Sequence, residues 1–144
     1  MGPKQRLPGS WHVLFFRRHK DDAPSQTVPG REFLRGEGRD AALKLQTILQ
    51  AVASAPPPSW PGGGTWEAMH DEMAGYYEAR TRVGGWLYRL FCFLERDVEG
   101  LPGPSIVVIT GSRKKNLTAF RPADYARVRA LGNEYKARVP RSVV

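Results

Sequence analysis

The chain has 144 residues, of which 41% are hydrophobic, and it carries a formal net charge of +8. This length and composition predict one domain with a hydrophobic core and exclude extensive disorder. No apolar run approaches the roughly 20 residues of a membrane-spanning helix, and the single cysteine excludes an internal disulfide framework and a Cys-rich zinc site.

The positive charge is concentrated towards both ends of the chain. Residues 1–36 hold seven basic and three acidic side chains, and residues 111–144 hold nine basic and two acidic ones. Residues 37–110 have a small acidic excess. This asymmetry favours a polyanionic partner, either nucleic acid or an acidic protein, although a solvated basic face would carry the same charge. The first nine residues lack the apolar stretch of a signal peptide, so we expect a cytoplasmic protein.

The first half of the chain predicts one strand followed by helices. Residues 11–16 are aromatic and β-branched, which indicates a strand. Residues 17–29 are polar and end in a proline, which predicts a loop, and residues 31–35 suit one helical turn. Residues 38–53 predict the clearest helix, because apolar residues recur there at spacings of three and four. A Pro- and Gly-rich stretch, residues 54–65, ends this helix as an internal loop.

In the second half the apolar period changes from about 3.6 residues to two, which predicts successive strands. We expect four strands, over residues 66–69, 75–82, 86–94 and 104–110. A basic loop over residues 111–120 and a closing helix over residues 122–138 follow them. Successive strands with short connections pair antiparallel. The predicted fold is therefore an α+β domain in which helices cover one face of a small antiparallel sheet. Arg80 and Arg82 would lie on the other, open face.

Five segments of the chain stand out as motifs. They are Gly75-Tyr76-Tyr77-Glu78-Ala79-Arg80, Tyr88-Arg89-Leu90-Phe91-Cys92-Phe93, the apolar and then basic residues 106–115, residues 126–135 and residues 11–16. The first two resemble the Gly-aromatic-Glu-x-Arg strand and the Tyr-Arg strand of the RelE/HigB-type toxins, most closely those of the phage-derived HigB-like branch. Residues 106–115 resemble the apolar strand of these toxins that runs into a Lys-Lys loop, residues 126–135 resemble their closing helix, and residues 11–16 match their opening strand. The similarity therefore spans most of the chain.

This resemblance implies a single toxin domain over residues 1–144, with a flexible start at residues 1–9. Proteins of this type are ribosome-associated endoribonucleases that an antitoxin neutralises, here expected to be a helix-turn-helix protein. They use no metal and no other cofactor. The 2′-hydroxyl of the RNA attacks the adjacent phosphate, while basic side chains hold that phosphate and stabilise its growing charge. The resemblance therefore implies messenger RNA and the ribosome as partners, and no membrane.

The expected cationic site follows from these motifs. Arg89 lies in an apolar strand, where a charge is costly unless it is paired or faces an open surface. Arginine suits phosphate because its planar fork meets two phosphate oxygens and keeps its proton. We expect a catalytic set, Arg80, Arg89, Arg113 and Lys115, and an RNA-binding set, Arg82, Lys114 and Arg121. The alternative for each is a solvated charge or a structural ion pair, for example with Glu78.

At the proton-transfer step the chain departs from the family pattern. Some relatives have a tyrosine shortly after the basic loop, where this chain has Phe120, which cannot donate a proton. The candidates for proton transfer are Glu78, as a base, and His70, as an acid or a base. His70 and the two acidic residues after it supply too few ligands for a metal site. Tyr125 and Tyr135 lie further along, and the spacing of Tyr135 predicts packing on the core face.

Two other functions fit the same fold. A ParE-like toxin poisons DNA gyrase and lacks the cationic catalytic set, and an inactive phage-derived homologue would bind without cutting. The arginines and the Lys-Lys pair favour the nuclease. Expression in cells separates the three hypotheses. A nuclease stops growth and leaves cut transcripts, a gyrase poison stops growth with damaged DNA and intact transcripts, and an inactive homologue does neither.

Overall fold

The structure, a computed structural model, describes residues 10–55, 57 and 64–144. The expected flexible start at residues 1–9 and most of the expected Pro- and Gly-rich loop lie outside the described residues. In the part of the chain that is described, no helix combines the length and the apolar character needed to cross a bilayer.

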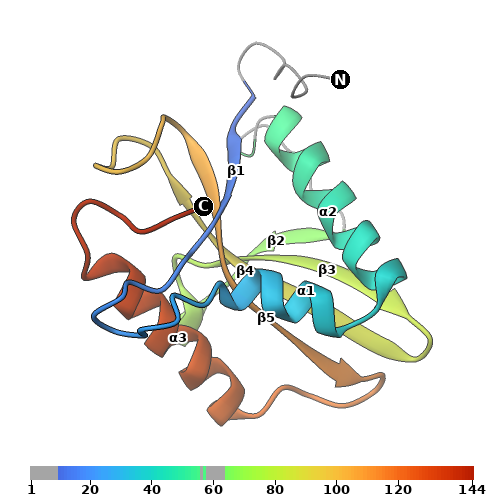
Figure 1. The fold of residues 1–144 in the computed structure, drawn as a ribbon. Helices are drawn as coiled ribbons and strands as arrows, with labels where there is room; N and C mark the ends of the chain where they lie inside the picture. Colours follow the sequence, from blue (N-terminus) through green and yellow to red (C-terminus); the bar gives the residue numbers. More distant parts are fainter. Residues whose placement is uncertain (1–9, 56, 58–63) are drawn as a thin grey trace.

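The described residues form five strands and three α-helices, which confirms the predicted α+β class (Figure 1). In chain order these are β1 (His12–Phe15), α1 (Pro29–Gly36), α2 (Arg39–Ser54), β2 (Trp66–Ala68), β3 (Tyr77–Val83), β4 (Trp86–Glu95), β5 (Ser105–Lys115) and α3 (Pro122–Lys136). A short 3₁₀ turn, η2 (Asp71–Met73), connects β2 to β3. Each element lies close to its predicted range, except that α1 is a full helix of eight residues and β5 is longer than expected.

The sheet has the order β1-β5-β4-β3-β2. The strands from β2 to β5 pair antiparallel, as predicted for successive strands with short connections. The expectation of an entirely antiparallel sheet is wrong at β1, which runs parallel to β5. The hairpin rule does not apply to this pair because α1, α2 and three strands separate the two strands in the chain.

Helices cover both faces of the sheet, so the expectation that they cover only one face is wrong. On the first face, here called the α1–α2 face, Leu45 and Leu49 of α2 pack with Leu90 of β4. On the second, the α3 face, Val128 and Tyr135 of α3 pack with residues of β4 and β5, namely Phe91, Phe93, Val107 and Ile109. The two central strands are apolar on both sides, and such strands need cover on both faces.

β5 continues through Lys115, so the expectation of a loop beginning at Gly111 is wrong. β4 accompanies β5 over its whole length, with Tyr88 opposite Arg113 and Trp86 opposite Lys115. Pairing with a long neighbour satisfies the backbone groups of the basic segment and keeps it extended. Side chains of consecutive strand residues point to opposite faces. This extension therefore decides which basic side chains meet.

Candidate functional site

Charged and polar side chains from four elements gather on the α3 face, where α3 leaves the sheet partly open. Glu78 and Arg80 come from β3, Arg89 from β4, Lys114 from β5 and Tyr125 from the first turn of α3. Arg80 lies directly opposite Arg89 in the sheet, and residues opposite each other in an antiparallel pair share a face. We call these five residues the Glu78 cluster.

Two arginines flank the Glu78 carboxylate. The Arg89 Nε lies 3.5 Å from Oε2 of Glu78, and the Arg80 Nη1 lies 3.6 Å from Oε1. The side chains of Glu78 and Arg89 are each 14% exposed, and that of Arg80 is 22% exposed. These distances give charge attraction but are too long for good hydrogen bonds. Within the described residues, the buried Nε of Arg80 also has no hydrogen-bond partner.

A second carboxylate contacts Arg80 from the edge of the sheet. Oε1 of Glu67 in β2 lies 2.6 Å from Nη2 of Arg80, and the Glu67 side chain is 50% exposed. Such an ion pair is half solvated and contributes little to stability. Arg80 therefore has one partner that water or a ligand can displace and a second, Glu78, at longer distance.

Burial shifts the proton affinities in the Glu78 cluster. It raises the pKa of Glu78, while the charges of Arg89, Arg80 and Lys114 oppose that shift. Burial also lowers the pKa of Arg89, against the opposing charge of Glu78. Arginine nevertheless stays protonated at neutral pH. The cluster thus combines a carboxylate of raised proton affinity with permanent cations.

Tyr125 brings a phenolic hydroxyl to the cluster, and no role was expected for this residue from the sequence. Its ring meets Phe91 at 6.3 Å and Phe120 at 5.7 Å between centroids. Burial, and then the charge of Glu78, raises the pKa of the Tyr125 hydroxyl, so this group stays protonated at neutral pH. A signal was present in the sequence, because Tyr125 precedes the core residue Val128 by three and therefore lies on the same side of the helix.

Of the three expected RNA-binding cations, Lys114 belongs to the Glu78 cluster, and Arg82 and Arg121 are exposed near it. Arg82 is exposed on the same face of β3, opposite Leu87. The Lys114 ammonium group donates a hydrogen bond to the Thr118 carbonyl and lies 5.5 Å from the centroid of the Phe120 ring. Arg121 precedes α3, and its side chain is 84% exposed. The rim of the cluster is therefore cationic.

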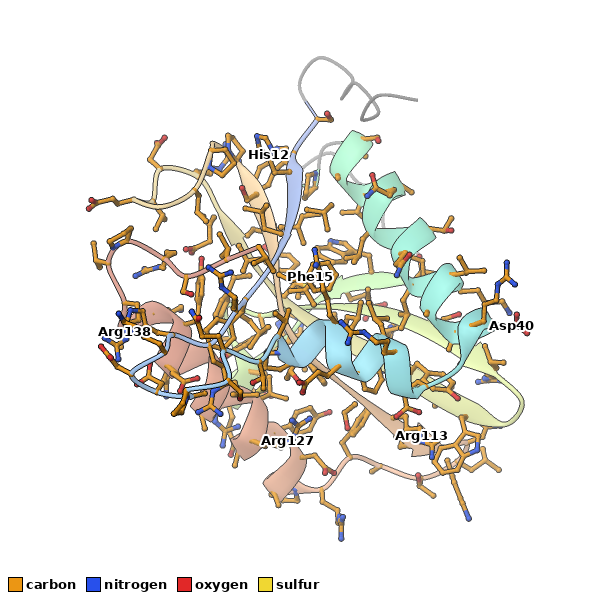
Figure 2. The ribbon with its side chains drawn as sticks, viewed as in Figure 1. His12, Phe15, Asp40, Arg113, Arg127 and Arg138 are labelled. Carbon is orange, nitrogen blue, oxygen red and sulfur yellow. The ribbon has the colours of Figure 1, made fainter. Side chains whose placement is uncertain are left out.

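Arg113 and Lys115 lie on the α1–α2 face, so the expectation that all the cations meet on one face is wrong for them. The guanidinium of Arg113 lies 4.0 Å from the centroid of the Trp86 ring, and Nε lies 3.1 Å from Oε2 of Glu37. The Lys115 ammonium lies 5.8 Å from the same Trp86 ring. Figure 2 shows Arg113 at the far end of β5. Strand alternation separates these two side chains from Lys114, which lies between them in sequence.

His70 is not brought into the Glu78 cluster. His70 is exposed and lies between β2 and η2. It follows Ala68, which pairs with Tyr77 at the end of β2. Within the described part of the chain, no hydrogen bond or ion pair joins His70 to Glu78, Arg80 or Arg89. Glu78 and Tyr125 are therefore the groups of this cluster that could exchange a proton.

Comparison of the chain with known protein families, curated proteins and solved structures found no match.

A groove of about 1010 Å³ lies elsewhere, between α1, α2 and β1. Its lining includes Val13, Phe15 and Leu34, and three basic residues, Arg31, Arg35 and Arg39. Among the described residues, its lining contains no acidic, histidine or tyrosine side chain, and so no group that could exchange a proton near neutral pH. We therefore assign the candidate chemistry to the Glu78 cluster and not to this groove.

The Glu78 cluster has the parts that a phosphate transfer within RNA requires. A carboxylate can accept a proton, two guanidinium groups can bind phosphate oxygens, and a neutral phenol can donate a proton. The rim cations can hold the flanking phosphates. The carboxylate, the two guanidinium groups and the phenol project from strands or from the first turn of a helix, which fixes their relative positions.

Proposed function

We propose that the chain is a RelE/HigB-like endoribonuclease that cleaves messenger RNA on the ribosome and thereby acts as the toxin of a toxin–antitoxin pair. One observation carries the proposal: Arg80 and Arg89 lie 3.5–3.6 Å from Glu78, on the partly open α3 face, beside Lys114 and Tyr125. The cytoplasm, a helix-turn-helix antitoxin and the ribosome are part of this proposal.

In the proposed reaction Glu78 accepts the proton of the ribose 2′-hydroxyl. The 2′-oxygen then forms a bond to the adjacent phosphorus, and the bond from phosphorus to the 5′-oxygen breaks. Arg80 and Arg89 bind the non-bridging oxygens, where negative charge increases in the transition state. Tyr125 donates a proton to the leaving 5′-oxygen. The products are a 2′,3′-cyclic phosphate and a 5′-hydroxyl, and solvent exchange restores the protons of both side chains.

The main alternative reading is a structural ion-pair network. An arginine that serves a buried carboxylate structurally is expected to form short, paired hydrogen bonds of about 2.7–2.9 Å. Arg18 and Glu134 show this pattern elsewhere in the molecule, with three hydrogen bonds of 2.8–3.2 Å. The contacts of Glu78 are longer, and the one short contact of Arg80 is with Glu67, whose half-exposed side chain a phosphate can displace.

The test uses the purified full chain and a 5′-labelled single-stranded RNA, with and without ribosomes. We expect cleavage that leaves a 2′,3′-cyclic phosphate, persists in EDTA, and disappears at a position where one 2′-hydroxyl is replaced by hydrogen. Intact RNA in both conditions would overturn the proposal. Growth arrest on expression, with intact transcripts and damaged DNA, would then favour the ParE-like alternative, and the absence of any effect would favour an inactive homologue.

A further inference from the structure

An aromatic and cationic cluster lies where β4 begins and β5 ends, on the face of the sheet opposite Glu78. We call Trp86, Arg113 and Lys115 the Trp86 cluster. Trp86 opens β4 directly after the Gly84-Gly85 turn and lies opposite Lys115 in the sheet. The Arg113 guanidinium lies over the indole ring at 4.0 Å, within the range of a close cation–π contact.

The Arg113 guanidinium is held in place but remains partly exposed to solvent. Its Nε lies 3.1 Å from Oε2 of Glu37, yet that buried oxygen has no hydrogen-bond partner among the described residues. The Arg113 side chain is 42% exposed. Trp86 and Glu37 therefore orient the guanidinium, while its remaining surface and donors face solvent.

The adjoining turn presents an apolar side chain to solvent beside these cations. Leu117 is 96% exposed and has a φ of +67°, a left-handed conformation that is uncommon for leucine. The backbone N–H of Asn116 donates to the Gly85 carbonyl at 2.8 Å, which ties this turn to the one before Trp86. This turn therefore places an aliphatic side chain in solvent two residues after Lys115.

The end of β5 connects this cluster with the Glu78 cluster. Lys114 points to the α3 face, while Arg113 and Lys115 on either side of it point to the α1–α2 face. A polyanionic strand that crosses the α3 face past Lys114 therefore reaches Lys115 and Trp86 around the end of the sheet. Cations interleaved with an aromatic ring are the usual composition of a surface that holds single-stranded nucleic acid.

We propose that the Trp86 cluster is a stacking subsite for the base of an unpaired RNA nucleotide that flanks the cleaved phosphate. The base lies on the exposed side of the Arg113 guanidinium, so that Trp86, Arg113 and the base form one stack. Lys115 meets the neighbouring phosphate, and Leu117 contacts the outer edge of the base. A paired base cannot enter such a stack, so the subsite selects single-stranded RNA. This inference rests on the proposed function, because it assumes an RNA ligand.

The first test measures binding without cleavage. A fluorescein-labelled single-stranded RNA carrying 2′-O-methyl groups is titrated with the full chain and followed by fluorescence anisotropy. We expect Trp86→Ala to weaken binding about 5- to 150-fold, the range of one lost base stack. Arg113→Ala is expected to weaken it too, and Trp86→Phe, which keeps a ring, much less. Arg96→Ala is the matched control, because it removes an arginine that lies 5.1 Å over another indole, that of Trp11.

The second test locates the base. Oligonucleotides with a single abasic site at successive positions are expected to lose affinity for the wild-type chain at one position, and to lose none there for Trp86→Ala. Equal binding by wild type, Trp86→Ala and Arg113→Ala would overturn the inference, as would equal losses from abasic sites in wild type and Trp86→Ala. If Trp86→Ala lowers the melting temperature, Arg113→Ala alone decides.

The outcomes keep the two proposals apart. Tight binding that depends on Trp86 in a chain that never cuts RNA overturns the proposed nuclease but supports the subsite. Cleavage of RNA by a chain in which Trp86→Ala and Arg113→Ala bind normally supports the nuclease and overturns the subsite.

Discussion

Glu78 lies among cations and still has a raised pKa. Burial outweighs the attraction of Arg89, Arg80 and Lys114, so the ionised carboxylate is less favourable in the folded chain than in water. The stability contribution of the protonated group is therefore fully present below the ordinary pKa of glutamate, and it is lost as pH rises through the raised pKa. A carboxylate that weakens the fold at neutral pH fits a proton acceptor better than a structural partner.

The substitution Glu78→Gln separates these two roles. It imitates the protonated carboxyl, so we expect a melting temperature at neutral pH equal to or above that of the wild type, with the difference disappearing in acid. We also expect RNA cleavage to fall about 10²- to 10⁴-fold. Thermal unfolding across pH and single-turnover cleavage measure the two effects. A lower melting temperature at neutral pH would instead show that the Glu78 ion pairs hold the fold.

The arginines of the Glu78 cluster give a second prediction at this scale. Arg80→Ala and Arg89→Ala are expected to lower cleavage about 10²- to 10³-fold and to remove toxicity without unfolding the domain. Arg89→Lys keeps the charge but loses the planar fork, so an intermediate rate is expected. Arg129→Ala, which removes a surface ion pair with Glu72 at 3.7 Å, is the control. Growth after induction and melting temperatures check this. An equal loss of thermal stability in both alanine variants would assign them structural roles.

At the scale of the element, α3 shows what periodicity predicts well. Tyr135 is fully buried against the sheet, as its spacing predicts, and so is Val128. The Tyr135 hydroxyl donates to Oε2 of Glu95 at 3.0 Å. Spacing at three and four places side chains on one side of a helix whatever it packs against. Periodicity did not show which face of the sheet α3 covers, because that depends on where α1 and α2 already lie.

The close approach of α3 to the sheet gives a prediction about stability. A Cβ atom at Gly132 would lie 1.9 Å from the Tyr76 hydroxyl oxygen and 3.1 Å from the Phe93 ring. Alanine normally stabilises a helix interior relative to glycine by about 1 kcal/mol. Here we expect Gly132→Ala to lower the unfolding free energy, by about 1–3 kcal/mol. Denaturant unfolding measures the change. The added substitution Tyr76→Phe is expected to restore part of the loss, and a stabilised Gly132→Ala would contradict the described packing.

At the scale of the whole molecule, charge and topology act together. The basic C-terminal end of the chain, residues 111–144, forms the end of β5 and α3. Lys114 therefore lies in the Glu78 cluster and Arg121 near it, while Lys115 lies on the opposite face of the sheet. The phosphates of an RNA strand that follows this surface would contact cations on both faces of the sheet. Affinity of this kind is dominated by the release of counterions from the RNA.

The salt dependence of binding tests this arrangement. For the uncleavable RNA we expect the logarithm of the affinity to fall with the logarithm of salt concentration, with a slope of about −0.7 for each neutralised phosphate. Arg82→Ala and Lys115→Ala should each reduce the slope by about one phosphate, whereas Trp86→Ala should weaken binding at an unchanged slope. Anisotropy titrations over a range of salt concentrations give these slopes. Affinity independent of salt would contradict binding of RNA by this basic surface.

By itself, the sequence determined the order of the strands and helices and the face that Arg80 and Arg82 share on one strand, because periods of two and 3.6 residues depend only on near neighbours. Only the tertiary structure decided that β1 runs beside β5, that α3 covers the second face, and that Tyr125 joins the Glu78 cluster while Arg113 and Lys115 join Trp86. These relations join residues far apart in the chain, and they follow from which surfaces must be covered together, a property of the packed molecule and not of any single segment.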